Sequence, residues 1–267
     1  MVKRAVALLG ACHPGPAFAV TLLAGLLAGA VGLGPGRVAL VVAAVLTGQL
    51  SIGWSNDLVD LARDRAVGRV DKPLADGRVS ERAVRTACAL AVAATVPLSL
   101  ACGWGAGLVH LVCVAAGWAY NLGLKSTPWS WLPYAVAFGG LPVFVALTAE
   151  PDQLPPLWLP LAGALLGVGA HFVNVLPDLA DDAATGVRGL PHRLGARWSP
   201  VVAAAVLVAA AVVIVVGAPV DSGVVAAAAL LLTAGLAAVA LLAHGRAPFR
   251  AAIAMALVDV AMLVWVR

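Results

Sequence analysis

Two groups of acidic residues stand at the ends of long apolar stretches of this chain. The first acidic group is Asp57, Asp60 and Asp64, and the second acidic group is Asp178 and Asp182. An ionised carboxylate beside hydrocarbon is costly unless a positive charge meets it, so acidic residues in such a place are candidates for function. Mg²⁺ takes oxygen ligands and commonly bridges one or two carboxylates to the phosphate oxygens of a substrate. The two groups therefore predict a magnesium site that holds a phosphorylated ligand.

Helical spacing gathers each acidic group on one face. On a helix that advances about 100° per residue, Asn56 shares an arc of about 100° with all three residues of the first acidic group. Asn174 stands four residues before Asp178, which in turn stands four residues before Asp182. Carboxylates confined in this way repel one another, and they protonate unless cations neutralise them. The spacing therefore supports a cation site at each group.

Basic residues flank both acidic groups. Those that could hold phosphate oxygens are Arg65, Arg69, Lys72, Arg78, Lys125 and Arg188. A site that contains both acidic and basic side chains suits a metal-bound diphosphate. Two alternatives stay open: the basic residues anchor the topology at the membrane surface, or they form salt bridges with solvated aspartates. The recurrence of the acidic pattern favours a binding site, and Lys125 stands out as the sole charge in its loop.

The composition indicates a membrane protein. Of the 267 residues, 62% are hydrophobic and 11% are charged, and the mean hydropathy is +0.99. A soluble domain has an apolar content of roughly 45–50%. The four cysteines lack the spacing of a metal site and read as small hydrophobic residues. The net charge of +4 and the pI near 9.2 do not indicate nucleic acid, because the basic residues form a topology signal.

Nine apolar stretches are long enough to cross a bilayer, which takes roughly 20 residues of helix. They are expected near residues 15–33, 38–56, 83–101, 105–122, 130–148, 157–177, 199–217, 223–243 and 248–266. No linker or low-complexity segment separates a second domain, so residues 1–267 are expected to form a single domain. The sequence thus predicts an all-α integral membrane protein.

The distribution of positive charge predicts the orientation. With a cytoplasmic N-terminus, all of the 17 Lys and Arg residues except Arg37 and Arg267 fall on the cytoplasmic side. Positive residues favour cytoplasmic loops, so this orientation is the expected one. It places both acidic groups on the cytoplasmic face, where they can meet. We therefore expect a multi-pass protein of the plasma membrane whose active-site mouth is cytoplasmic.

The acidic groups also belong to longer motifs. Residues 56–64 fit the pattern NDxxDxxxD and are followed by Lys72-Pro73, while residues 178–191 fit DxxxD followed by a glycine and Leu-Pro. In combination these motifs resemble the signatures of the UbiA superfamily of intramembrane prenyltransferases, over most of the length of the chain. The resemblance implies nine transmembrane helices in one bundle around a central cavity, with both acidic motifs under cytoplasmic caps.

The resemblance also implies an activity. A Mg²⁺-dependent transferase of this kind moves a prenyl group from an allylic prenyl diphosphate to a small lipophilic acceptor, which we expect to be aromatic. Each acidic group would bind one of two Mg²⁺ ions, with Asn56 orienting the first group and Lys72, Arg78 and Lys125 stabilising the departing diphosphate. Further candidates for substrate contact are Arg65, Tyr120, Asn121, His171, Asn174 and Arg188. No partner is expected besides the substrates and the lipid bilayer, and in particular no obligate protein partner.

His171 lies seven residues before Asp178, on the same helix face, so it could contact the acceptor or take its proton. Two departures from the family pattern affect the other candidates. One extra residue separates Tyr120 from Lys125, compared with the YxxxK spacing that is frequent in the family. The first helix begins at Cys12-His13-Pro14, where many relatives with aromatic acceptors have an Arg-Pro pair, and this makes a carboxylate-bearing acceptor less expected.

Two other functions stay open at this point. A terpene cyclase of the same superfamily would use the same aspartates but would need no second substrate. A transporter could also use paired intramembrane acids to bind a cation, although such sites lie near the bilayer midplane. Clustering of the acids at one face argues against transport.

Overall fold

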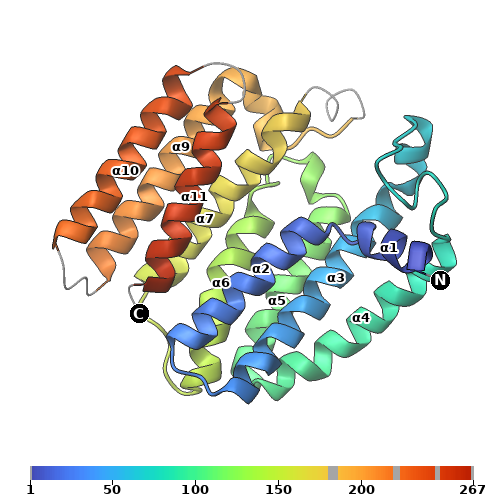
Figure 1. The fold of residues 1–267 in the computed structure, drawn as a ribbon, viewed down its shortest axis with the longest axis horizontal. Coiled ribbons are helices and arrows are strands. Elements are labelled where there is room, and N and C mark those ends of the chain that lie inside the picture. Colours follow the sequence, from blue (N-terminus) through green and yellow to red (C-terminus); the bar gives the residue numbers. More distant parts are fainter. Residues whose placement is uncertain (1, 180–185, 219–222, 244–246, 266–267) are drawn as a thin grey trace.

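The computed structural model describes residues 2–179, 186–218, 223–243 and 247–265, and these residues form helices joined by short connections. The α-helices are α1 (Val2–Gly10), α2 (Pro14–Ala30), α3 (Pro35–Ala66), α4 (Glu81–Ala101), α5 (Trp104–Asn121), α6 (Leu132–Ala149), α7 (Trp158–Val175), α9 (Leu190–Gly217), α10 (Gly223–Leu242) and α11 (Ala247–Trp265). Two short 3₁₀ helices, η1 (Leu124–Ser126) and η2 (Leu176–Asp178), follow α5 and α7. Figure 1 shows α9, α10 and α11 on one side of the bundle, α2 to α5 on the other, and α6 and α7 between them.

Each of the nine predicted stretches coincides with one long helix of the described residues, from α2 to α11. Seven of the described helices are long and apolar enough to cross a membrane, and the number rises to eight if the bent pair formed by α1 and α2 counts as one span. The axis bends by 70° between these two helices. α5 is not among these helices, because Trp104, His110, Tyr120 and Asn121 lower its mean hydropathy. The all-helical membrane fold is thus confirmed.

α3 is the element in which prediction and structure differ most. The predicted stretch ends at residue 56, whereas α3 runs through Ala66. The apolar pattern stops at the first charges, but Leu58, Leu61 and Arg63 still favour a helix, and Arg63 pairs with Asp60 one turn earlier. The helix ends in a Schellman motif, in which Gly68 adopts a φ of 68° and its N–H donates to the carbonyl of Arg65. The whole first acidic group therefore lies inside a continuous helix.

Glycines bring the helices of the central pair into close contact. A Cβ on Gly163 of α7 would lie 2.5 Å from the carbonyl oxygen of Phe138 and 3.2 Å from the Cα of Gly139, both on α6. A Cβ on Gly140 would meet the sulfur of Cys113 on α5. These glycines pack helices against one another, as small residues commonly do in membranes.

The connection from residue 67 to residue 80 is held onto the bundle by its own apolar side chains. Leu74 and Val79 are buried and pack in one cluster with residues of α1, α3 and α4. This connection, the last turns of α3, and the end of α7 lie at the same end of the bundle, the upper end in Figure 1. We call it the site end, because it carries the candidate residues described next.

Candidate active site

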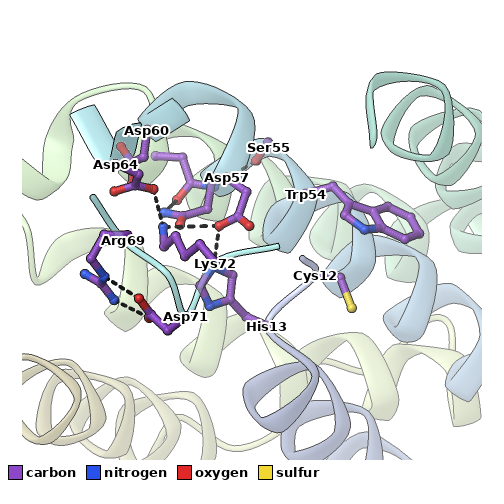
Figure 2. A network of polar contacts seen from close by, with 12 residues as sticks. Cys12, His13, Trp54, Ser55, Asp57, Asp60, Asp64, Arg69, Asp71 and Lys72 are labelled. Carbon is purple, nitrogen blue, oxygen red and sulfur yellow. Dashed lines mark hydrogen bonds and ion pairs between the residues drawn. The ribbon is translucent and has the colours of Figure 1, made fainter. Parts of the chain in front are cut away.

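The last turns of α3 bury three carboxylates on one face. Asp57, Asp60 and Asp64 are 2%, 5% and 2% exposed, as the helical spacing predicts for residues on a shared face. Each carboxylate lies against at least one positive or titratable side chain from another segment of the chain. Figure 2 shows these partners for Asp57, which meets His13 and Lys72, and for Asp64, which meets Lys72. Buried carboxylates need such compensation, because an unpaired buried charge is strongly destabilising.

Lys72 bridges two of these carboxylates. Its Nζ lies 3.2 Å from Asp57 Oδ1 and 2.7 Å from Asp64 Oδ2, so the ammonium sits between the two side chains (Figure 2). Burial alone would lower the pKa of Lys72, but the charges of Asp57 and Asp64 outweigh it and raise the pKa. The sequence predicted Lys72 for the diphosphate, and the structure places it between the carboxylates.

Lys125 neutralises the middle carboxylate. From η1 its Nζ donates to Asp60 Oδ1 at 2.5 Å and to Asp60 Oδ2 at 2.7 Å. Arg63 reaches the same carboxylate at 2.9 Å. Burial lowers the pKa of Lys125; the hydrogen bond and charge of Asp60 offset this only in part, and Arg63 and Lys72 lower it further. The shift makes Lys125 easier to deprotonate than an ordinary lysine.

His13, like Arg63, belongs to this cluster but was not among the predicted site residues. Its Nε2 lies 3.0 Å from Asp57 Oδ1, and the residue occupies the corner between α1 and α2 with a φ of 54°. The corner lies directly on α3: a Cβ on Gly53 would overlap the carbonyl oxygen of Cys12, and Trp54 Nε1 donates to Leu8 O at 2.9 Å. The available signal was the Cys12-His13-Pro14 segment, at the position where the resemblance predicted a functional pair.

Two asparagines join α3 to α5 next to the first acidic group in the sequence of α3. Asn56 Nδ2 donates to Asn121 Oδ1 at 3.2 Å. Asn121 is buried, and its Nδ2 donates to Ile52 O at 2.9 Å and to Ser55 Oγ at 2.8 Å. Asn56 was predicted to orient the first acidic group and Asn121 to contact substrate; in the structure the two join α3 to α5.

The end of α7 contributes His171 to a group of aromatic side chains from α5, α6 and α7. His171 is 1% exposed, and the centroid of its ring lies 4.8 Å from that of Tyr134 and 5.8 Å from that of Tyr120. Asn174, one turn later, is exposed and donates to the hydroxyl of Tyr134 at 3.5 Å. Buried Ser130 lies 2.9 Å from His171 Nε2. The structure therefore gathers three of the predicted substrate residues, Tyr120, His171 and Asn174, around Tyr134.

Other basic candidates point elsewhere. Arg78 forms an ion pair with Asp76, and its Nη2 donates to Val70 O at 3.0 Å. Arg69 makes a bidentate pair with Asp71, which lowers the pKa of that exposed carboxyl to about 2 through the hydrogen bond from Arg69 (Figure 2). Arg65 and Arg188 have exposed side chains. Arg69 touches the first acidic group through its backbone, whose N–H donates to Asp64 O at 3.0 Å, and the printed ion pairs of Arg69 and Arg78 go to Asp71 and Asp76.

The second acidic group is described only in part. The backbone of Asp178 closes η2, directly after α7, so it lies at the site end with the first acidic group (Figure 1). The side chain of Asp178 and the whole of Asp182 lie outside the described residues. Beyond them, a Cβ on Gly189 would lie 2.7 Å from Lys125 O and 2.8 Å from Ser130 Oγ. The last part of the second motif therefore packs against η1, which carries Lys125.

The residues of the first acidic group fit a hard divalent cation in kind. They offer buried carboxylate oxygens, the ligand type that Mg²⁺ prefers. Asp64 Oδ2 has no hydrogen bond of normal geometry; Lys72 lies 2.7 Å from it, and Arg63 lies 3.8 Å from the other oxygen of the same carboxylate. Within the described ranges no three acidic, histidine or cysteine side chains converge closely enough to hold a metal ion. Lys72 instead lies between Asp57 and Asp64, and Lys125 pairs with Asp60.

Comparison with known proteins agrees with the family resemblance of the sequence motifs. Residues 17–265 match the profile of the UbiA prenyltransferase family. Digeranylgeranylglyceryl phosphate synthase of Methanothrix thermoacetophila is 31% identical over 163 residues, which are 55% of each protein. The chain therefore matches about half the length of this curated relative.

Solved structures share the fold. A structure of digeranylgeranylglyceryl phosphate synthase superposes with a TM-score of 0.74 at 16% identity and covers 100% of this chain and 99% of its own. A UbiA homologue from Aeropyrum pernix K1 gives 0.73 at 20% identity, with 92% and 97% covered. One from Archaeoglobus fulgidus, bound to GPP and Mg²⁺, gives 0.73 at 15% identity, with 97% and 99% covered. The family profile spans nearly the whole chain, and this protein belongs to the UbiA prenyltransferase family.

Proposed function

We propose that this prenyltransferase uses Mg²⁺ and an allylic prenyl diphosphate to prenylate an aromatic acceptor at the cytoplasmic face of the plasma membrane. The observation that supports the proposal best is the row of three buried carboxylates on α3, Asp57, Asp60 and Asp64, each paired with Lys72 or Lys125. A diphosphate brings negative charge and the metal positive charge, so such a mixed cluster can exchange its internal ion pairs for contacts to both. GPP and DMAPP, each with Mg²⁺, are bound in structures of the Archaeoglobus homologue.

In this proposal the first acidic group holds one of two Mg²⁺ ions, and Asp178 with Asp182 holds the other. Bound Mg²⁺ neutralises the diphosphate and makes it a better leaving group. Lys72 and Lys125, released from the carboxylates, donate hydrogen bonds to the diphosphate oxygens as the allylic C–O bond breaks. The electron pair of that bond leaves with the diphosphate, and the apolar bundle keeps water from the allylic cation.

The acceptor completes the reaction in this proposal. A carbon of its ring attacks the allylic carbon, a C–C bond forms, and the ring carbon loses its proton. Tyr120, Tyr134 and His171 provide aromatic surface against which a flat acceptor can stack. The curated relative is named for a glyceryl phosphate product, so an acceptor of that chemistry is the second candidate. A cyclase that needs no acceptor is the third, because it would use the same carboxylates.

Carboxylate substitutions test the proposal. Asp57→Asn and Asp60→Asn each remove a charge without changing the shape of the side chain, and we expect each to lower prenyl transfer by about 100-fold or more, as for other electrostatic catalytic groups. Asp152→Asn, an exposed carboxylate between α6 and α7, is the matched control and should keep the wild-type rate. Wild-type turnover by Asp57→Asn, or full activity in EDTA, would refute the mechanism. Product formed from prenyl diphosphate alone would identify a cyclase.

A further inference from the structure

The hydrogen bonds around His171 determine which of its ring nitrogens carries the proton. Ser130 Oγ accepts a hydrogen bond from the backbone N–H of Leu190 at 2.8 Å and lies 2.9 Å from His171 Nε2. A hydroxyl has one hydrogen to donate and two lone pairs with which to accept. If His171 Nε2–H donated to Ser130, the hydroxyl hydrogen of this fully buried serine would have no acceptor among the described residues. If Ser130 donates to Nε2 instead, its hydrogen is used, and the imidazole proton lies on Nδ1.

The resulting Nδ1–H of His171 is an unpaired donor. His171 is 1% exposed, and its Nδ1 has no hydrogen-bond partner among the described residues. Buried polar groups in folded proteins are nearly always paired, so an unpaired donor at a candidate site calls for a ligand atom. Nε2, the other nitrogen, is occupied by the hydroxyl of Ser130 and cannot take a proton from a substrate in this arrangement. The geometry favours His171 as a donor and disfavours it as a general base.

The surroundings of His171 indicate what kind of atom it meets. The rings of Tyr134 and Tyr120 lie beside the imidazole, so a bound molecule there has aromatic neighbours. Ser130 connects the same place to Lys125 through their shared contact with Gly189, and Lys125 holds Asp60. The imidazole therefore has an aromatic surface beside it, and through Ser130 and Gly189 it is linked to the segment that carries Lys125.

We propose, on the basis of the function proposed above, that His171 Nδ1–H donates a hydrogen bond to the oxygen of a phenol-type acceptor, and that Ser130 is a positioning residue that holds the required tautomer. This contact orients the acceptor so that the ring carbon next to the oxygen-bearing carbon faces the allylic carbon of the prenyl group. An acceptor that reacts through its own hydroxyl, as in ether formation, needs a base at that hydroxyl, which His171 does not provide. The acceptor class is thus a phenol that is prenylated on carbon.

Two substitutions of similar size separate the two nitrogens. The amide nitrogen of asparagine falls near the position of histidine Nδ1, and that of glutamine near Nε2. His171→Asn therefore keeps the proposed donor, while His171→Gln keeps the contact to Ser130 and loses the donor. We would measure transfer from geranyl diphosphate with Mg²⁺ to neutral phenols, beginning with 2-naphthol, using the full chain in nanodiscs. Thermal unfolding of each variant checks that it folds.

The expected result is a change in the KM of the phenol alone. His171→Gln should raise it by about tenfold, the effect of one lost hydrogen bond, and His171→Asn by less than about threefold. The KM of geranyl diphosphate should stay the same in both variants. At low phenol concentration His171→Gln should also release more geraniol, because ionised donor then meets water before acceptor.

Three outcomes would overturn the inference: an unchanged phenol KM in His171→Gln, equal increases in both variants, or transfer by the wild type only to acceptors that react through a hydroxyl. The last would leave the prenyltransferase activity standing. In contrast, product formed from geranyl diphosphate with no acceptor would contradict the proposed function itself. Ser130→Ala gives an independent readout, since loss of the fixed tautomer should raise the phenol KM while the donor KM stays constant.

Discussion

At the scale of single residues, Lys72 behaves as a built-in counter-cation. It contributes the charge that Asp57 and Asp64 need when no other cation is present. Lys72→Met should therefore lower the stability of the metal-free protein by about 3 kcal/mol, the usual cost of breaking a buried ion pair. Added Mg²⁺ should restore the melting temperature of Lys72→Met and raise that of the wild type less, because Mg²⁺ and Lys72 serve the same carboxylates.

Arg69→Met is the matched control for this measurement. Arg69 lies on the same connection, but it pairs with Asp71, whose side chain is 60% exposed. A surface pair of this kind contributes up to about 1 kcal/mol, so the melting temperature of Arg69→Met should stay close to that of the wild type. Equal responses of the wild type and Lys72→Met to Mg²⁺ would show that the cation binds somewhere else.

The backbone of His13 gives a second prediction at this scale. Its φ of 54° lies in the left-handed region, which asparagine and glycine adopt readily and β-branched residues avoid. His13→Asn should keep the corner between α1 and α2, whereas His13→Val should cost about 1–3 kcal/mol. Chemical denaturation in mild detergent would measure both. Equal stability of the two variants would mean that the corner does not depend on this conformation.

At the scale of elements, the contact of the α1–α2 corner with α3 depends on Gly53. Any Cβ there would overlap the carbonyl oxygen of Cys12, so Gly53→Ala should push the corner, and His13 with it, away from Asp57. We expect a lower melting temperature and weaker binding of prenyl diphosphate. Gly235→Ala in α10 is the control: a Cβ there meets nothing within 4 Å, and alanine favours a helix by about 1 kcal/mol. Unchanged binding of prenyl diphosphate by Gly53→Ala would show that the α1–α2 corner does not contribute to the substrate site.

The elements could be predicted from the sequence better than the contacts between them. Apolar runs located the long helices, but the same criterion ended α3 at residue 56. Apolar content alone does not reveal that other segments of the chain bury the charges in the last turns of α3. Helical spacing correctly placed Asp57, Asp60 and Asp64 on one face. It could not show that Lys72 and Lys125 reach those carboxylates while Arg78 turns to Asp76, since these partners are chosen by the path of the chain in space.

At the scale of the whole molecule, the site end gathers residues that are far apart in the sequence. His13, Asp57, Lys72 and Lys125 come from four different segments and meet in one cluster. The motif at residues 178–191 approaches the same place through Gly189. The prediction of a single domain over residues 1–267 agrees with this convergence but stays a prediction, as do the central cavity and the second metal ion.

The charge distribution also predicts how the whole molecule sits in its membrane. The connection at residues 67–80 carries Arg69, Lys72 and Arg78, and the loop between α6 and α7 has no positive residue, so the positive-inside rule places the former in the cytoplasm. Val70 and Leu154, both 79% exposed, mark these two connections, and all four native cysteines are buried. Val70→Cys should therefore react with a membrane-impermeant maleimide only after the cells are permeabilised, whereas Leu154→Cys should react in intact cells. The wild type, with buried cysteines, sets the background. Labelling in the opposite order would place the carboxylate cluster on the outer face and contradict the orientation that the positive charges predict.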